Sequence, residues 1–509
     1  MSTADLRRQL TQIEAAISQQ KSALASLERD KEALQRQLYA ASNFPVLTLP
    51  VEITTKIFSQ CLPDVEYLRS CFSQVKLQAP MVLTGVCRAW RDITLTTPAL
   101  WAALYLPLNL MNPAFVTETG RVEEFIDKWI NRAGLYPLSL IFYTREGPNF
   151  EKEAKNPIGP IRLREIIHRY AHRVQYLELG MPQDHIRQLG LDSCSFPLLQ
   201  EAALGDSRGD RNPQIPFRVY GNAPQLRELC LLSDTVLSSY TTPCLQLTKF
   251  EGEIDTLELF TLAPNLIEAQ CFLLDLSFVP ASAILHSRLE SLTFSAPWGY
   301  ENPANPLPHL TLPALRSLSF GQLEESPVQS LYSFLTRSSP PLRTLSVDVY
   351  RERDAFPAWE SCFSCVGATL ENLELMFANS EFHTGIFHLD SQTMEKDSPS
   401  CLPRLRTLNI LESQVGLDFW ALVHFLYKRS TTSSFAKIRS FRFTSSEHFF
   451  PSDRFSAGAS GEYHEDEATN HLANLASKGI DIRIESMHKA HVNHVQYVPG
   501  DEAYDAPRT

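Results

Sequence analysis

The first forty residues carry apolar side chains at alternating spacings of four and three residues, with no proline or glycine before Pro45. This is the heptad pattern of a coiled-coil helix, whose a and d positions form one apolar seam. About 36 residues at ~1.5 Å each make a rod of roughly 54 Å. The d positions are Leu6, Ile13, Gln20, Leu27 and Leu34, and the a positions are Leu10, Ile17, Leu24, Lys31 and Leu38.

We expect this helix, residues 1–42, to form a parallel homodimer through residues 6–41. A lysine at an a position is tolerated in a two-stranded seam because its ammonium group can extend outward. The alternative is a helix that packs on its own chain or on another protein. The helix should end at Asn43, Phe44 and Pro45, since proline disfavours helix in the residue before it.

A second pattern recurs from about residue 174: an apolar residue, two others, an apolar residue, one other and a third apolar residue. Eleven copies begin at 174, 199, 226, 247, 266, 289, 315, 342, 370, 405 and 438, and helical patterns such as 330–335 and 418–426 lie between them. Their period resembles that of leucine-rich repeats. The asparagine that usually follows the strand is missing from most copies. We therefore expect an irregular, leucine-rich-repeat-like α/β solenoid over 174–485, a horseshoe with its strands on the concave side. An ordinary α/β domain with leucine-rich strands is the alternative.

The residues between the apolar positions of each strand should face the concave, solvated side. They are mostly small and polar, with a few apolar exceptions such as Phe272 and Met376. Such a surface suits a protein or peptide better than a small molecule. The target-binding candidates are Thr344, Ser346, Asp348, Asn372, Glu374, Thr407, Asn409 and Arg442; the alternative is that they are only solvated strand residues.

A compact all-helical module is predicted over 43–104. Pro50 suits the start of a helix, Ile53 and Ile57 lie one turn apart, and Val86 and Trp90 share a face of a later helix. The module resembles an F-box in the order of four short motifs: Leu49-Pro50-x-Glu52-Ile53, Ile57-Phe58, Val86-Cys87-Arg88-x-Trp90-Arg91 and Pro98-x-Leu100-Trp101.

The resemblance implies docking on a Skp-type adaptor, which a cullin holds in turn within an SCF ubiquitin ligase. The implied adaptor contacts are Leu49, Pro50, Ile53, Ile57, Phe58, Val86, Cys87, Trp90, Leu100 and Trp101. The stretch from Pro63 to Pro80 is longer than a minimal F-box needs, which would weaken or redirect this contact. An ordinary helical hairpin with a tryptophan core is the alternative.

Between the module and the repeats, residues 105–173 are expected to cap the solenoid. The spacing predicts a helix over 122–130 and a buried strand over 137–143. This pair followed by repeats also resembles the fungal group of F-box proteins with degenerate leucine-rich repeats.

No catalytic, cofactor or metal site is expected. Cys362-x-x-Cys365 has no second ligand pair at a suitable spacing, and Trp359, Cys362, Phe363 and Val366 form the core face of a helix. We interpret His488, His491 and His494 as surface histidines, with a transition-metal site as the alternative. The chain contains no Gly-x-Gly-x-x-Gly, Gly-x-Ser-x-Gly or phosphate-binding Gly-Lys-Ser/Thr motif.

The charge balance, 46 basic against 58 acidic residues, argues against binding to nucleic acid or to an anionic membrane. The N-terminus lacks a secretory pattern, the cysteines are scattered and no Asn-x-Ser/Thr occurs, so we expect a cytoplasmic or nuclear protein. Half of the net negative charge lies from Glu447 onward. We expect that acidic stretch, including Glu462 to Glu467, to be flexible, with a tail over 486–509.

These patterns together predict a substrate-recognition subunit without enzymatic activity of its own. It would bind the adaptor through the F-box and an unidentified target protein through the repeats. The alternative is a scaffold or regulatory protein that uses the same two surfaces without a ligase.

Overall fold

A computed structural model describes residues 3–41, 49–63, 79–108, 122–144, 160–205, 216–232, 235–278, 280, 282–296, 304–321, 328–349, 356–388, 402–413, 417–432, 435–445 and 462–486. The chain divides into two compact units, Met1–Trp101 and Ala102–Thr509.

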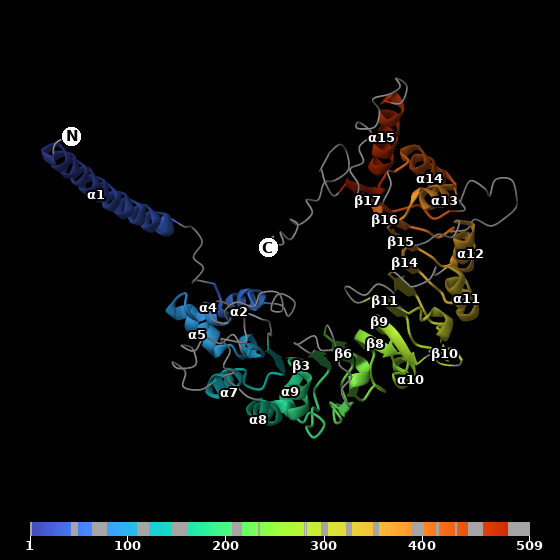
Figure 1. Cartoon of the computed structure of the whole chain (residues 1–509), viewed down its shortest axis with the longest axis horizontal. Helices are drawn as coiled ribbons and strands as arrows, with labels where there is room; N and C mark the ends of the chain where they lie inside the picture. Colours follow the sequence, from blue (N-terminus) through green and yellow to red (C-terminus); the bar gives the residue numbers. More distant parts are fainter. Residues whose placement is uncertain are drawn as a thin grey trace. The chain divides into compact units, whose positions relative to one another are not determined.

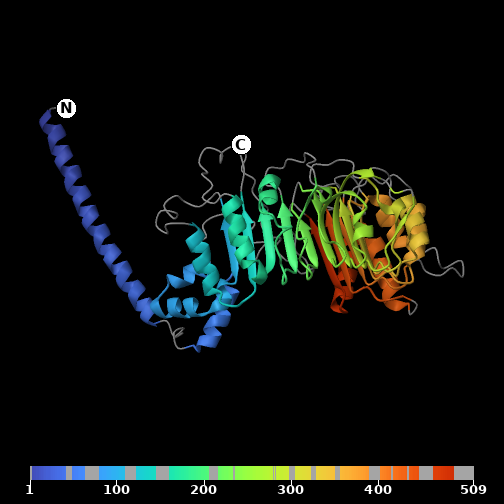
Figure 2. The same cartoon turned by 90° about the horizontal axis from the view of Figure 1, so that it is seen from below.

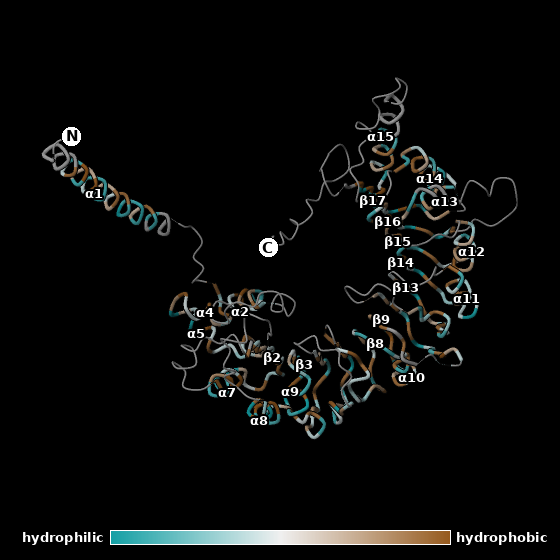
Figure 3. Tube along the Cα trace, viewed as in Figure 1, coloured by the Kyte–Doolittle hydropathy of each residue, from teal (hydrophilic) through white to brown (hydrophobic). Residues whose placement is uncertain are grey.

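The first unit begins with a long helix, α1 (Thr3–Ala41), as the heptad pattern predicts. Every side chain of α1 that the structure describes is exposed. Figure 3 shows hydrophobic and hydrophilic residues intermixed along the helix. Its apolar seam is therefore uncovered in the single chain, and its pairing stays a prediction.

The rest of the first unit is a small helical module. It comprises α2 (Val51–Gln60), α4 (Met81–Thr84), α5 (Arg88–Thr96) and the 3-10 turn η3 (Pro98–Trp101). Its core contains Phe58, Leu83, Leu100 and Trp101. The indole Nε1 of Trp101 donates a hydrogen bond to the carbonyl of Thr94 at 2.8 Å, which joins η3 to the end of α5. Most of the long stretch between Pro63 and Pro80 lies outside the described residues.

The second unit is built on one large, open parallel sheet. In the described part of the chain this sheet has fourteen strands, and each pairs in parallel with the next one in its order. Figures 1 and 2 show the strands side by side along a curved array, with the helices on its outer side. In spatial order the strands are β1 (Ala103–Pro107), β2 (Leu138–Tyr143), β3 (Val174–Gly180), β4 (Glu201–Gly205), β6 (Glu228–Leu231), β8 (Lys249–Thr256), β9 (Glu268–Phe278), β11 (Ser291–Ser295), β13 (Ser317–Phe320), β14 (Thr344–Asp348), β15 (Asn372–Met376), β16 (Thr407–Ser413), β17 (Ser440–Ser445) and β18 (Asp481–Ser486).

The register of the sheet aligns the apolar positions of the recurring phrase. Leu292 pairs with Leu318, and the same row continues through Leu345, Leu373 and Leu408. All five side chains are buried. Each strand thus covers its apolar side chains against those of its neighbours, which accounts for the recurrence of the phrase.

The segments that return from one strand to the next are helical toward both ends of the sheet and extended near its middle. The middle copies of the phrase are 19 to 27 residues apart, and the helical segments between them have only three or four residues. There, two short parallel pairs join successive returns: β5 (Phe217–Arg218) with β7 (Tyr240–Thr241), and β10 (Ile284–Leu285) with β12 (Leu310–Thr311). The 3-10 turns η5 (Leu237–Ser239) and η6 (Leu307–His309) directly precede β7 and β12. The other returns contain α7 (Val122–Arg132), α8 (Pro160–Tyr170), η4 (Ala171–Arg173), α9 (Gln183–Gln188), α10 (Leu259–Leu262), α11 (Val328–Ser338), α12 (Phe356–Val366), α13 (Ser380–His388), α14 (Phe419–Thr431) and α15 (Glu462–Ser477).

Two sequence-based expectations about the ends of the sheet are wrong. The sheet begins at β1, within residues assigned to the helical module and the cap, so it is longer than predicted. The stretch from Glu462 to Glu467, expected to be flexible, lies in α15, which leads into the last strand. Leu472, Leu475 and Ile482 are buried and dock these elements. Of the predicted tail, only Ser486 is described.

Candidate protein-interaction surfaces

The start of α2 exposes a short apolar face on the helical module. The carbonyl of Pro50 accepts hydrogen bonds from the backbone amides of Ile53 and Thr54, both at 3.0 Å, so the helix begins immediately after the proline. Ile53 and Ile57 lie one turn apart and are each 44% exposed, whereas Thr54 and Phe58, one position later, face the core. Helical spacing therefore divides α2 into an apolar outer face and a core face.

Another exposed apolar side chain of the module lies in the turn before α5. The Cys87 Sγ accepts a hydrogen bond from the Trp90 amide at 3.5 Å and caps α5. The Arg91 side chain donates to the Thr84 carbonyl at 2.8 Å, which ties α5 to α4. Val86, in the turn between these helices, is 56% exposed.

The structure separates the predicted adaptor contacts into two groups. Pro50, Ile53, Ile57 and Val86 are exposed, and Leu49, Cys87 and Trp90 are partly exposed. Phe58, Leu100 and Trp101 are buried, and a buried side chain holds the module together without offering surface to a partner. Assigning these three to adaptor contact was wrong. Phe58 instead packs edge-on against Trp90, with ring centroids 4.8 Å apart.

In the described part of this module, three large exposed apolar side chains were not among the predicted contacts, and one of them is Leu95, which is 36% exposed at the end of α5. Val51 is 54% exposed and Val82 is 42% exposed. Val51 is the variable residue of the Leu-Pro-x-Glu-Ile motif, so its position beside the predicted contacts could have indicated that it is exposed too. Val82 lies on a four-residue helix, which is too short for a periodic pattern.

The inner face of the sheet, opposite the buried apolar rows, carries two rows of side chains in register. We call them the inner rows. The first runs Glu201, Glu228, Lys249, Glu268, Ser291, Ser317, Thr344, Asn372, Thr407 and Ser440, and the second runs Ala203, Cys230, Glu251, Gln270, Thr293, Ser319, Ser346, Glu374, Asn409 and Arg442.

The inner rows are acidic over β4 to β9. Glutamates occupy four of their positions there, and the ammonium group of Lys249 lies 3.6 Å from the carboxylate of Glu268. Partial burial and the neighbouring Glu228 carboxylate raise the pKa of Glu201, while Lys249 acts in the opposite direction. Like charges thus lie close together on this part of the sheet.

Farther along, the inner rows consist mostly of neutral polar side chains, and hydrogen bonds join several of them to the Glu374 carboxylate or to each other. Ser346 and Asn409 donate to the two carboxylate oxygens of Glu374, each at 3.0 Å. Asn372 donates to the hydroxyl of Thr344 at 3.1 Å. The set crosses β14, β15 and β16 and holds the Glu374 carboxylate in a defined position.

The predicted target-binding residues therefore form one continuous patch. Thr344, Asp348, Asn372, Glu374, Thr407 and Asn409 are partly exposed, and Arg442 is exposed. Ser346 departs from the prediction that it faces solvent: it is only 9% exposed. Its hydroxyl is turned toward the Glu374 carboxylate, which accepts its hydrogen bond.

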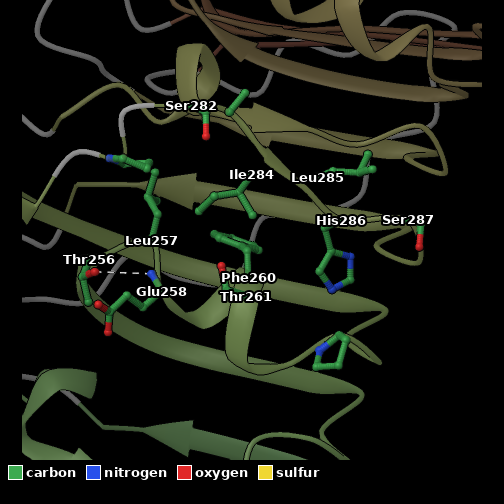
Figure 4. A pocket seen from close by; sticks show the side chains of 13 residues that line it. Thr256, Leu257, Glu258, Phe260, Thr261, Ser282, Ile284, Leu285, His286 and Ser287 are labelled. Carbon is green, nitrogen blue, oxygen red and sulfur yellow. Dashed lines mark hydrogen bonds between the residues drawn. The ribbon is translucent and has the colours of Figure 1, made fainter.

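A hollow of about 450 Å³ lies beside α10 and β10, among the returning segments. Figure 4 shows its lining, which includes Glu258, Phe260 and His286. The His286 Nε2 lies 3.0 Å from the carbonyl of Ala263, and its Nδ1 accepts the backbone amide of Leu289 at 3.1 Å. The Nε2 contact joins His286 to the preceding return and the Nδ1 contact holds its own return, so both ring nitrogens have structural partners.

The predicted core face around Cys362-x-x-Cys365 is confirmed. Trp359, Cys362, Phe363 and Val366 are buried on α12, and the Cys362 thiol donates to the carbonyl of Val328 at 3.4 Å. Cys365 is exposed, so the two thiols differ in environment. Among the residues that the structure describes, no group of three His, Cys, Asp or Glu side chains is placed to hold a metal ion. His488, His491 and His494 lie outside those residues.

Thiol labelling should separate the cysteines by burial. Burial raises the pKa of Cys271 to about 12 and that of Cys244 to about 11, and only the thiolate is nucleophilic. With iodoacetamide at pH 8 we expect the exposed Cys61 and Cys365 to be alkylated first. Cys271 and Cys244 should react only after unfolding, as followed by peptide mass spectrometry. Early labelling of Cys271 would contradict its buried position.

Comparison with known proteins does not identify a family for this chain. A scan against protein-family models found no match, and a search of curated proteins found none that is significantly similar. Within the described residues, no helix combines the length and the apolar composition needed to cross a membrane.

Proposed function

We propose that the chain is the substrate-recognition subunit of an SCF-type ubiquitin ligase. The exposed side chains of Pro50, Ile53, Ile57 and Val86 would dock on a Skp-type adaptor, and a cullin would hold that adaptor. One observation carries the proposal. The four motifs occur in the order typical of an F-box, and several of their apolar side chains are exposed on the small helical module, where a partner could cover them.

For the second unit we propose an irregular leucine-rich-repeat-like solenoid that binds a target protein. Supporting this are the parallel strands in chain order, the aligned apolar rows and the joined returns. The inner rows, and in particular the patch around Glu374, would contact the target. The chain would then contribute proximity, by holding a target lysine near the charged conjugating enzyme.

Affinity purification of the full chain from cells tests the ligase role. We expect a Skp-type adaptor and a cullin to co-purify in comparable amounts. Recovery of the adaptor without a cullin would favour the alternative, a scaffold that uses the F-box outside a ligase. Absence of both would contradict the F-box assignment.

A further inference from the structure

The uncovered seam of α1 fits a second copy of the same chain. Leu10, Leu24 and Leu27 are 57%, 58% and 66% exposed, and the other seam residues that the structure describes are exposed as well. A seam with this spacing is satisfied by another helix of matching heptads, which a second copy supplies.

The charges beside the seam distinguish the two ways of aligning the copies. Positions e and g flank the seam, and their ion pairs set partner choice and orientation. The e positions of the described residues are Glu14, Lys21, Glu28 and Gln35, and the g positions are Ala16, Ala23, Asp30 and Gln37. Three of these four charged residues are therefore at e positions, and Asp30 alone is at a g position.

A parallel pair places each g residue beside the e residue of the next heptad. Lys21 would then face Ala16, and Glu28 would face Ala23, so no ion pair forms at either place. The two copies of Lys31 would also share one a layer, which sets like charges against each other.

An antiparallel pair places e residues beside e residues. When Leu10 opposes Leu27 of the second copy, Glu14 of each copy lies beside Lys21 of the other, giving two attractive pairs. By heptad position, residue 7 of one copy, an arginine in the sequence, would lie beside Glu28 of the other copy in the same alignment. The two Lys31 positions are then about 25 residues apart along the axis, roughly 37 Å.

We propose that two copies of this chain associate through α1 in this antiparallel alignment. It replaces the parallel alignment expected from Lys31 alone, and it does not depend on the ligase role. The paired surface is the seam of Leu10, Ile13, Ile17, Leu24 and Leu27, flanked by Glu14 and Lys21.

Charge reversals in the full-length chain test the alignment. Sedimentation equilibrium should give wild-type protein twice the 57.5 kDa of one chain. Glu14→Lys alone and Lys21→Glu alone should each weaken the dimer roughly tenfold, because each turns two attractive pairs into two repulsive ones. Arg29→Glu, the same charge change at an outward f position, is the control and should leave the dimer unchanged.

Complementation completes the test. Differently tagged Glu14→Lys and Lys21→Glu chains, once mixed, should pair with each other in preference to themselves. The double variant Glu14→Lys/Lys21→Glu should pair as wild type does. Single variants that dimerise as well as wild type and show no preference on mixing would overturn the antiparallel alignment. A wild-type mass of one chain would overturn the pairing itself.

Discussion

Replacing Ile53 and Ile57 together by aspartate should reduce binding of a Skp-type adaptor at least 100-fold. Both side chains are 44% exposed on one face of α2, so the change should cost the module little stability while it places two charges in an apolar contact. Biolayer interferometry of the full chain against purified adaptor measures the effect.

The matched control for this pair is Leu135→Asp. Leu135 is 96% exposed in a turn of the second unit, so the same kind of substitution should leave both adaptor binding and folding unchanged. Circular dichroism of all variants checks the fold. If Ile53→Asp/Ile57→Asp binds the adaptor as tightly as wild type does, the face described here is not the docking surface, and the F-box proposal loses its main support.

Arg429→Ala should destabilise the last units of the sheet by about 3 kcal/mol. Arg429 is only 1% exposed on α14 and donates to the carbonyl of Leu402 at 3.0 Å. Its guanidinium carbon lies 4.9 Å from the ring centroid of Phe425 and 5.0 Å from that of Phe435. Alanine would remove the hydrogen bond and both ring contacts and leave a cavity.

Hydrogen exchange resolved by residue is the suitable measurement, since units of a repeat array can open separately. We expect lower opening free energies for α14, β16 and β17 and unchanged values for β3 and β4. Arg429→Lys, which keeps the charge but not the planar donor group, should have an intermediate effect. His424→Ala, at an exposed position of the same helix, serves as the control. An Arg429→Ala protein with wild-type exchange would show that this residue does not support the packing.

The strands were predictable because one physical cause repeats. Adjacent strands place leucines such as Leu318, Leu345 and Leu373 side by side in one buried row. The same spacing of apolar residues therefore recurs in the sequence each time the chain adds a strand to the sheet. β1 has no such phrase, and it was missed. In α15 and β18 the abundance of acidic residues concealed Leu472, Leu475 and Ile482.

Candidate surfaces were harder to predict than strands. The motif order identified the helical module, but it could not tell Ile57, which is exposed, from Phe58, which is buried. Helical spacing contained that signal, because Thr54 and Phe58 share the core face. The clustering of glutamates in the inner rows depends on the register of four strands, β4, β6, β8 and β9, which are separated in the sequence by their connecting segments. Composition alone cannot show that Glu201 and Glu228 become neighbours.

Sequential pairing of the strands has a consequence for how such a chain is made and how it changes. Each strand of the sheet needs only the one before it as a template, so the array can form in the order of synthesis, from β1 toward β18. Duplication or loss of a unit would disturb only two junctions, and the remainder would keep its contacts. The extent of the inner face, and with it the size of the target protein that we propose it binds, is set by the number of strands and not by any single residue.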